Sequence, residues 1–199
     1  QLWVDAQDSS TIIDSDGDTI GSGDFNGGVN KWLDKSSQNH DFTQDIGTTD
    51  HLANGLNGMP ALDFDGSSLT NNTLLNAGGI SGRTVFAVSQ ADVSVASGII
   101  SLNRVFSGSS AGKAYILTPE IAARVSGNVM FDESVSTMEG TIAVLKNPDG
   151  GNVDSIQGFK NGHKLSTTGS LNGGAQLDIK GASTTIGRQN FLDFTGKIS

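Results

Sequence analysis

The segment Asp14-Ser15-Asp16-Gly17-Asp18 places three carboxylates within five consecutive residues, a composition that can bind a hard cation. Calcium takes six to eight oxygen ligands, and a glycine-containing loop rich in aspartate supplies several of them at once. The segment is not an EF-hand, because Gly17 comes too early and no glutamate stands at the twelfth position of the loop. We expect Asp14, Asp16 and Asp18 to bind calcium, and an ordinary Asp-Gly hairpin tip is the alternative.

A second polar loop spans residues 147–154 and is longer than a tight hairpin turn requires. It carries two asparagines and two aspartates, which are Asn147, Asn152, Asp149 and Asp154. We expect all four residues to contact the ligand, with Asp149 and Asp154 also binding calcium. Such an ion can bridge to sugar hydroxyls or to the carboxylate at a peptide end. A solvated loop without a ligand is the alternative.

The composition of the chain restricts its partners and its location. The formal net charge is −9, and an acidic surface without a Lys/Arg cluster repels phosphate backbones, so we expect no nucleic-acid partner. No apolar run approaches the roughly 20 residues of a membrane-spanning helix, so we expect no membrane insertion. Cysteine is absent. Together with the Asp/Asn/Gly-rich loops, this favours an extracellular protein of a bacterial cell surface, stabilised by ions rather than disulfides.

The elements that must position these loops are short strands. Alternating or β-branched segments recur about every ten residues between Gly, Asn and Asp, which is typical of a sandwich. The expected strands are residues 61–64, 84–88, 98–102, 114–117, 141–145, 155–159 and 184–187. Residues 25–30 and 119–123 could each form about one turn of helix. Asn161-Gly162 separates two strand-like runs and predicts a tight hairpin, because both residues tolerate positive φ.

A set of motifs occurs in the order seen in one family of β proteins. They are LWVDA at residues 2–6, VNKWLDKS at 29–36, NGLNGMPALDFDG at 54–66, TVFAV at 84–88, FKNG at 159–162, IGR at 186–188 and FTGKI at 194–198. This set resembles the bacterial laminin-G-like, concanavalin A-like jelly rolls of large surface adhesins. The resemblance implies an all-β, two-sheet antiparallel β-sandwich, with residues 1–199 forming a single domain that is a monomeric module of a longer protein.

The sequence departs from the pattern of this family in two places. Residues 36–39 lack the glycines that usually follow the Trp-x-Asp-Lys-Ser segment. The sequence also ends before the family's usual last strand, which we expect to be absent or to be supplied by neighbouring sequence.

The apolar positions of the expected strands predict the core of the sandwich. The side chains expected between the sheets are Phe64, Phe86, Val88, Ile100, Ile116, Ile142, Val144 and Ile186. Trp3 and Trp32 both have apolar neighbours and are also expected in the core. The sequence therefore predicts no aromatic platform for sugar rings.

Catalytic groups are sparse. Concanavalin A-like glycosidases carry Glu-x-Asp-x-x-Glu on one strand, which holds two carboxyl groups about 5 Å apart for retaining hydrolysis. The glutamates Glu120, Glu133 and Glu139 do not form this motif. Asp63 and Asp65 share a strand face, but their segment matches a structural turn of the resembling family. No nucleophile elbow, phosphate loop or His-rich metal motif occurs, so we expect no catalytic residues and no enzymatic activity.

The combined prediction is a non-catalytic, calcium-dependent recognition module of a bacterial surface adhesin. The expected ligand is an extracellular carbohydrate or the end of a peptide. A polysaccharide-degrading enzyme of the same fold and an inert spacer domain are the alternatives. An enzyme would release products, and a spacer would gain no stability from a ligand.

Overall fold

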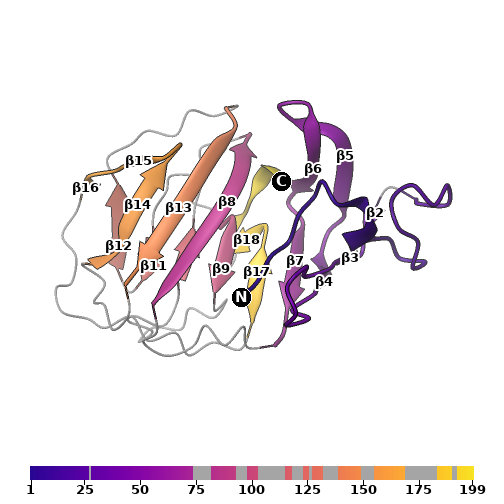
Figure 1. Cartoon of the computed structure of the whole chain (residues 1–199), viewed down its shortest axis with the longest axis horizontal. Coiled ribbons are helices and arrows are strands. Elements are labelled where there is room, and N and C mark those ends of the chain that lie inside the picture. The colour runs from indigo at the N-terminus through magenta and orange to yellow at the C-terminus, as the bar shows by residue number, and fades with distance from the viewer. Residues whose placement is uncertain are drawn as a thin grey trace.

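The structure is a computed structural model of the chain. It describes residues 1–26, 28–73, 82–92, 98–102, 115–117, 123–125, 127–131, 139–148, 155–168, 183–189 and 192–199. Within these ranges the chain forms two large antiparallel sheets and the short 3-10 helix η1 (Ser9–Thr11). The sheets form two layers, with β8 and β13 in front of β9 and β17 in the view of Figure 1.

The first sheet has ten strands in the described part of the chain. In spatial order they are β1 (Ile12–Ile13), β3 (Lys31–Trp32), β4 (Phe42–Ile46), β7 (Ser68–Asn71), β17 (Thr184–Ile186), β9 (Ile100–Leu102), β10 (Tyr115–Leu117), β11 (Ala123–Val125), β12 (Gly127–Phe131) and β16 (Thr167–Thr168). A short separate pair joins β18 (Arg188–Gln189) to β19 (Leu192–Asp193).

The second sheet has eight described strands. In spatial order they are β15 (His163–Lys164), β14 (Gln157–Lys160), β13 (Thr141–Asn147), β8 (Arg83–Ala91), β20 (Thr195–Ile198), β6 (Met59–Asp65), β5 (Thr49–Leu56) and β2 (Gly28–Val29). Neighbouring strands pair antiparallel, as in β13 with β8 and β20 with β6. The prediction of an all-β, two-sheet antiparallel sandwich is confirmed.

One hydrophobic core lies between the two sheets. It joins Phe42 and Leu69 of the first sheet to Phe64 and Leu145 of the second, and all four are fully buried. The ring of Phe64 meets that of Phe194 edge-on, with ring centroids 6.4 Å apart. The core predictions for Phe64, Ile186 and Trp32 are confirmed.

The predicted facing of β8 and β13 is wrong. Phe86 and Ile142 are exposed, because Val85 and Leu145, which pair across the same two strands, are the side chains that enter the core. Successive side chains of a strand point to opposite faces, so a prediction displaced by one residue exchanges all buried positions of the strand with exposed ones. A further three predicted core residues, Val88, Ile100 and Val144, are only partly buried, and the side chain of Ile116 lies outside the described residues.

The local predictions had mixed outcomes. The Asn161-Gly162 hairpin is confirmed, because these residues have φ of 49° and 83° and join β14 to β15. The helix predicted for residues 25–30 is wrong, since Gly28 and Val29 form β2 instead. The other predicted helical turn, residues 119–123, falls outside the described residues apart from Ala123, which begins β11.

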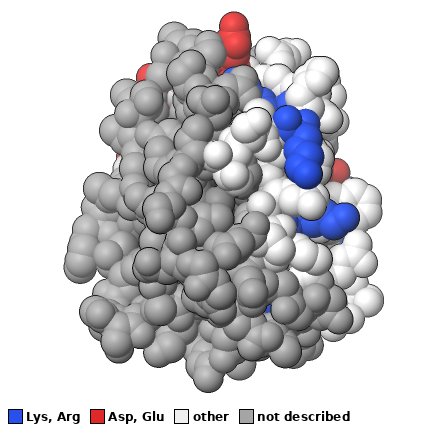
Figure 2. All heavy atoms as spheres, turned by 90° about the vertical axis from the view of Figure 1, so that its left-hand side faces the viewer, with Lys and Arg blue, Asp and Glu red and all other residues white. Residues whose placement is uncertain are grey.

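The edge of the second sheet is marked by lysines. Lys164 lies on the terminal strand β15, and Lys160 lies beside it on β14. Lys and Arg side chains are visible on the described part of this side of the molecule (Figure 2). Charged side chains at a sheet edge oppose unwanted pairing with other chains. Among the described residues, no helix is long and apolar enough to span a membrane.

Candidate ligand-binding groove

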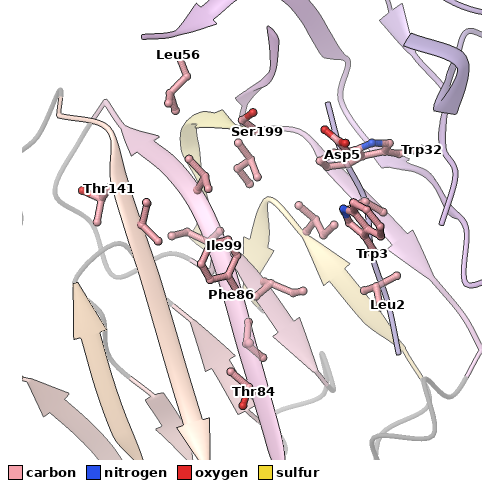
Figure 3. A pocket seen from close by; sticks show the side chains of 18 of the residues that line it. Leu2, Trp3, Asp5, Trp32, Leu56, Thr84, Phe86, Ile99, Thr141 and Ser199 are labelled. Carbon is pink, nitrogen blue, oxygen red and sulfur yellow. The ribbon is translucent and has the colours of Figure 1, made fainter. Parts of the chain in front are cut away.

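A groove with a volume of about 1070 Å³ opens beside β8. Its walls come from the N-terminal segment, from β8 and from the tip of the β5–β6 hairpin. Trp3 on the N-terminal segment and Phe86 on β8 stand on opposite sides of it (Figure 3). The groove therefore brings together residues that are far apart in the sequence.

Exposed apolar side chains are concentrated in this groove. The large hydrophobic side chains that the described structure leaves exposed are Trp3 (53 %), Met59 (45 %), Phe86 (62 %) and Ile142 (42 %). All four line the groove. An apolar patch that gathers in one concave place, rather than scattering over the surface, marks a site of interaction.

Trp3 is held in place by its backbone and by a cation. Its N–H donates to Asp34 Oδ1 at 2.9 Å, and its carbonyl accepts from the Lys35 N–H at 2.7 Å. The Lys35 ammonium lies 4.8 Å from the centroid of the Trp3 ring and also pairs with Asp5 and Asp8. The expectation that Trp3 belongs to the core is wrong, because these bonds fix the N-terminal segment at the rim of the groove.

Asp34 organises the corner that supports Trp3. Its carboxylate accepts from the backbone N–H groups of Trp3, Ser36 and His40 and from the Ser36 hydroxyl. Burial raises the pKa of the Asp34 carboxyl, but these hydrogen bonds favour the ionised form more strongly, and the pKa falls below its ordinary value. Asp34 is therefore a charged anchor for the chain segment that presents Trp3.

Polar groups line the groove around the apolar side chains. Asn57 at the β5–β6 turn, Thr84 on β8 and Thr141 on β13 are among them. Asn57 has φ of 51° and is followed by Gly58 at 78°, so this turn is a second Asn-Gly hairpin. Amide and hydroxyl groups of this kind can donate and accept hydrogen bonds beside an apolar surface.

The three aspartates of the Asp14-Ser15-Asp16-Gly17-Asp18 segment do not form a ligand cluster. No group of three or more His, Asp or Glu side chains in the described part of the chain could hold a metal ion. Asp14 is buried, and its carboxylate accepts from the N–H groups of Asp16, Asp18 and Asn26 at 2.9–3.1 Å. Burial raises the pKa of Asp14, but the N–H bonds led by Asp18 and Asn26 leave it below its ordinary value. In this conformation the Asp14 carboxylate closes the turn, and calcium binding by Asp14, Asp16 and Asp18 stays a prediction.

The second predicted loop is described only at its start. Asn147 ends β13, is buried, and accepts from the Ser155 hydroxyl at 3.4 Å through its Oδ1. Asp149, Asn152 and Asp154 lie outside the described residues. Their roles in ligand and calcium binding stay predictions.

Asp63 and Asp65 lie on the same sheet as the groove but do not line it. Asp63 pairs across the strands with Asp50 on one side and Lys197 on the other. Burial is the main cause that raises the pKa of Asp63, and the nearby carboxylates add to it against the opposing charge of Lys197. Among the described residues that line the groove, the charged side chains are those of Asp5 and Arg83, so these side chains include no pair of carboxyl groups of the kind used in glycoside hydrolysis.

Comparison with known proteins supports the fold. No family model matches the chain, and no curated protein matches it. A similar solved structure is domain 4 of AbnA, a GH43 extracellular arabinanase from Geobacillus stearothermophilus, in complex with arabinotriose. The TM-score is 0.57 at 15 % sequence identity, over 78 % of this chain and 74 % of that chain. This likeness shows the fold.

The groove residues were not predicted from the sequence. Trp3 and Phe86 were assigned to the core because each lies in a run of apolar neighbours. One signal was present: residues 85–88 are apolar at consecutive positions, so both faces of this strand carry apolar side chains and only one of them can face the core. The other sheet covers only the inner face of β8, so Phe86 on the outer face is left at the surface.

Proposed function

We propose that this domain is a non-catalytic carbohydrate-recognition module and that the groove beside β8 is its binding site. The observation that carries the proposal is the gathering of Trp3, Met59, Phe86 and Ile142, the exposed large apolar side chains of the described structure, in one groove. The polar groups of Asn57, Thr84 and Thr141 in the same groove supply hydrogen-bonding partners.

This combination suits the two-sided chemistry of a sugar. The C–H groups of a sugar ring pack against an aromatic face, while its hydroxyls bond amides and hydroxyls at the margin. The net charge of −9 disfavours polyanionic glycans, so a neutral oligosaccharide is the expected ligand. The solved structure of a similar fold in complex with arabinotriose supports a carbohydrate as the ligand class.

The finer parts of the proposal concern the setting of the domain. We place it in a bacterial surface adhesin outside the cell, where its ligand is an extracellular glycan, and we retain calcium dependence through the loop at residues 147–154. The motif resemblance and the Asp/Asn-rich composition support these parts.

The experiment is an array of neutral oligosaccharides, followed by calorimetric titration of the ligands that bind. Trp3→Ala and Phe86→Ala should each weaken binding at least tenfold, because each removes an aromatic surface from the groove. Phe159→Ala is the matched control, since Phe159 lies on β14 in the cross-strand row of Val144 and Phe86 but does not line the groove.

Two results would contradict the proposal. Sugar binding that survives both groove substitutions would move the site elsewhere. Release of reducing ends from the bound polysaccharide, above the level of a heat-denatured control, would make the domain an enzyme.

A further inference from the structure

Two hairpins of the second sheet end in the same Asn-Gly turn, and the asparagine of each turn lines the groove. Asn57 and Gly58 have φ of 51° and 78°, while Asn161 and Gly162 have φ of 49° and 83°. All four residues are exposed. Because the two turns share their sequence and nearly the same φ values, a difference in their reactivity has to come from their surroundings.

The carboxamides of the two asparagines are held differently. The Oδ1 of Asn161 accepts from the Ile142 N–H at 2.9 Å, and the Asn161 N–H donates to the Ile142 carbonyl at 2.9 Å. The Asn57 carboxamide lies against Gly140, where a Cβ would come within 2.7 Å of its Nδ2. In the described part of the chain this carboxamide has no hydrogen-bond partner. Rotation of the Asn57 side chain therefore breaks no hydrogen bond.

The strands that carry the two turns also differ. The pairing of β14 with β15 continues without interruption to the Asn161-Gly162 turn. In the other hairpin the pair Leu56–Met59 closes the turn, and the register of β5 against β6 shifts between Leu52 and Leu56. One isolated pair restrains a hairpin tip less than a continuous ladder does. The backbone of the Asn57 turn therefore rotates at a lower cost.

An asparagine followed by glycine loses its amide without an enzyme when both its side chain and its backbone can rotate. The deprotonated glycine nitrogen attacks the asparagine Cγ, ammonia leaves, and a succinimide ring forms. Water opens the ring at either carbonyl and gives aspartate or isoaspartate, so amide and water become carboxylate and ammonium. Gly58 does not block the attack, because it has no side chain and no neighbour lies within 4 Å of its Cβ position.

We propose that Asn57 is a site of spontaneous deamidation in the folded protein and that the hydrogen bonds of Asn161 protect the matching turn. The product adds a carboxylate to a groove whose described lining holds one acidic side chain, that of Asp5. Isoaspartate also lengthens the backbone of the tip that carries Met59. The charge and shape of the groove therefore change with the age of the protein. The modification does not depend on the proposed function, whereas its effect on sugar binding does.

The test follows deamidation of the 199-residue protein in mildly alkaline buffer by peptide mapping. Fragment ions assign each product to Asn54, Asn57 or Asn161, since glycine follows all three. Asn57 should react at least about fivefold faster than Asn161, because ring closure at Asn161 first has to break a hydrogen bond. The same measurement in concentrated urea is the control. There the difference between Asn57 and Asn161 should disappear, because the surroundings of both turns are lost.

A variant links the modification to the groove. Asn57→Gln keeps an amide but would have to close a six-membered ring, so deamidation at this position should become undetectable on the same timescale. Fresh and aged samples of wild type and Asn57→Gln are titrated with arabinotriose, the ligand in the similar solved structure. The wild type should lose affinity with age, and the variant should keep the affinity of its own fresh sample.

Three outcomes overturn the proposal. Equal rates at Asn57 and Asn161 in the folded protein would show that the hydrogen bonds give no protection. A difference that persists in urea would assign the rates to the flanking sequence. Reaction at Asn54 in place of Asn57 would move the site. Fresh wild type that does not bind arabinotriose counts against the proposed function, while the peptide map still decides the modification.

Discussion

At the scale of single residues, the Asp34 carboxylate joins the N-terminal segment at Trp3 to the loop that holds Ser36 and His40. Asp34→Asn should lower the free energy of unfolding by about 2–3 kcal/mol, since a charge-assisted acceptor of partly or fully buried N–H groups is replaced by a neutral amide. It should also weaken sugar binding, because Trp3 loses its anchor. Urea unfolding measures the first effect, and Asp24→Asn at an exposed position is the control.

The pH dependence of stability gives a separate test of the same residue. The pKa of Asp34 is lower in the folded protein than its ordinary value of 3.8, so its contribution is complete above that value. The contribution is lost as the pH falls through the folded pKa. Wild type and Asp34→Asn should therefore differ most near neutral pH and converge in strong acid. A constant difference at all pH values would contradict the assignment.

The pKa of Asp63 is shifted in the opposite direction to that of Asp34. Its pKa is raised, mainly by burial and then by Asp92, Asp50 and Asp65 against Lys197, so the folded state disfavours its charge. Stability should therefore fall as the pH rises through the folded pKa of Asp63. Asp63→Asn should raise the melting temperature at pH 7 and leave it unchanged below the ordinary pKa of 3.8. A decrease at pH 7 would show that the attraction of the Lys197 charge for the Asp63 carboxylate outweighs the effect of burial.

At the scale of elements, Gly187 at the end of β17 shows how closely the two layers approach. Its φ is +84°, and a Cβ there would overlap the ring of Phe64. Gly187→Ala should cost about 2–4 kcal/mol from strain and overpacking together. Gly21→Ala is the matched control, since Gly21 has φ of +90° with no neighbour within 4 Å, and should cost about 1 kcal/mol. Similar thermal shifts in the two variants would contradict the overlap.

The strands could be predicted from the sequence, but which face of β8 and β13 is buried could not. β6 and β17 were placed correctly, with Phe64 and Ile186 in the core, because each has a clear inward residue. In β8 and β13 apolar residues follow one another, so periodicity does not decide which face is buried. The pairing with neighbouring strands and the second layer decide it, and these are long-range properties. The same ambiguity hid the groove, whose exposed Phe86 was taken for a core residue.

At the scale of the whole molecule, the acidic charge and the polar loops could be read from the sequence, but their local use could not. Asp14, Asp16 and Asp18 are close in sequence, and that proximity predicted a shared ion. In the structure the carboxylate of Asp14 turns inward to three backbone N–H groups, while Asp16 is exposed. The sequence shows how many carboxylate oxygens lie close together along the chain, and the backbone geometry decides in which direction each carboxylate points.

The hydrogen bonds of Asp14 make the effect of calcium on the stability of the domain testable loop by loop. If calcium is bound at about 100 times its dissociation constant, linkage adds about 2.7 kcal/mol of stability. For a domain of this size the melting temperature should then rise by roughly 5–11 °C in calcium relative to chelator. Asp149→Ala with Asp154→Ala should remove this rise without lowering stability in chelator. Asp14→Ala should lower stability equally in calcium and in chelator, because its partners are backbone N–H groups. Coincident melting curves of the wild type in calcium and in chelator would remove the metal from the proposed function and leave the groove as its basis.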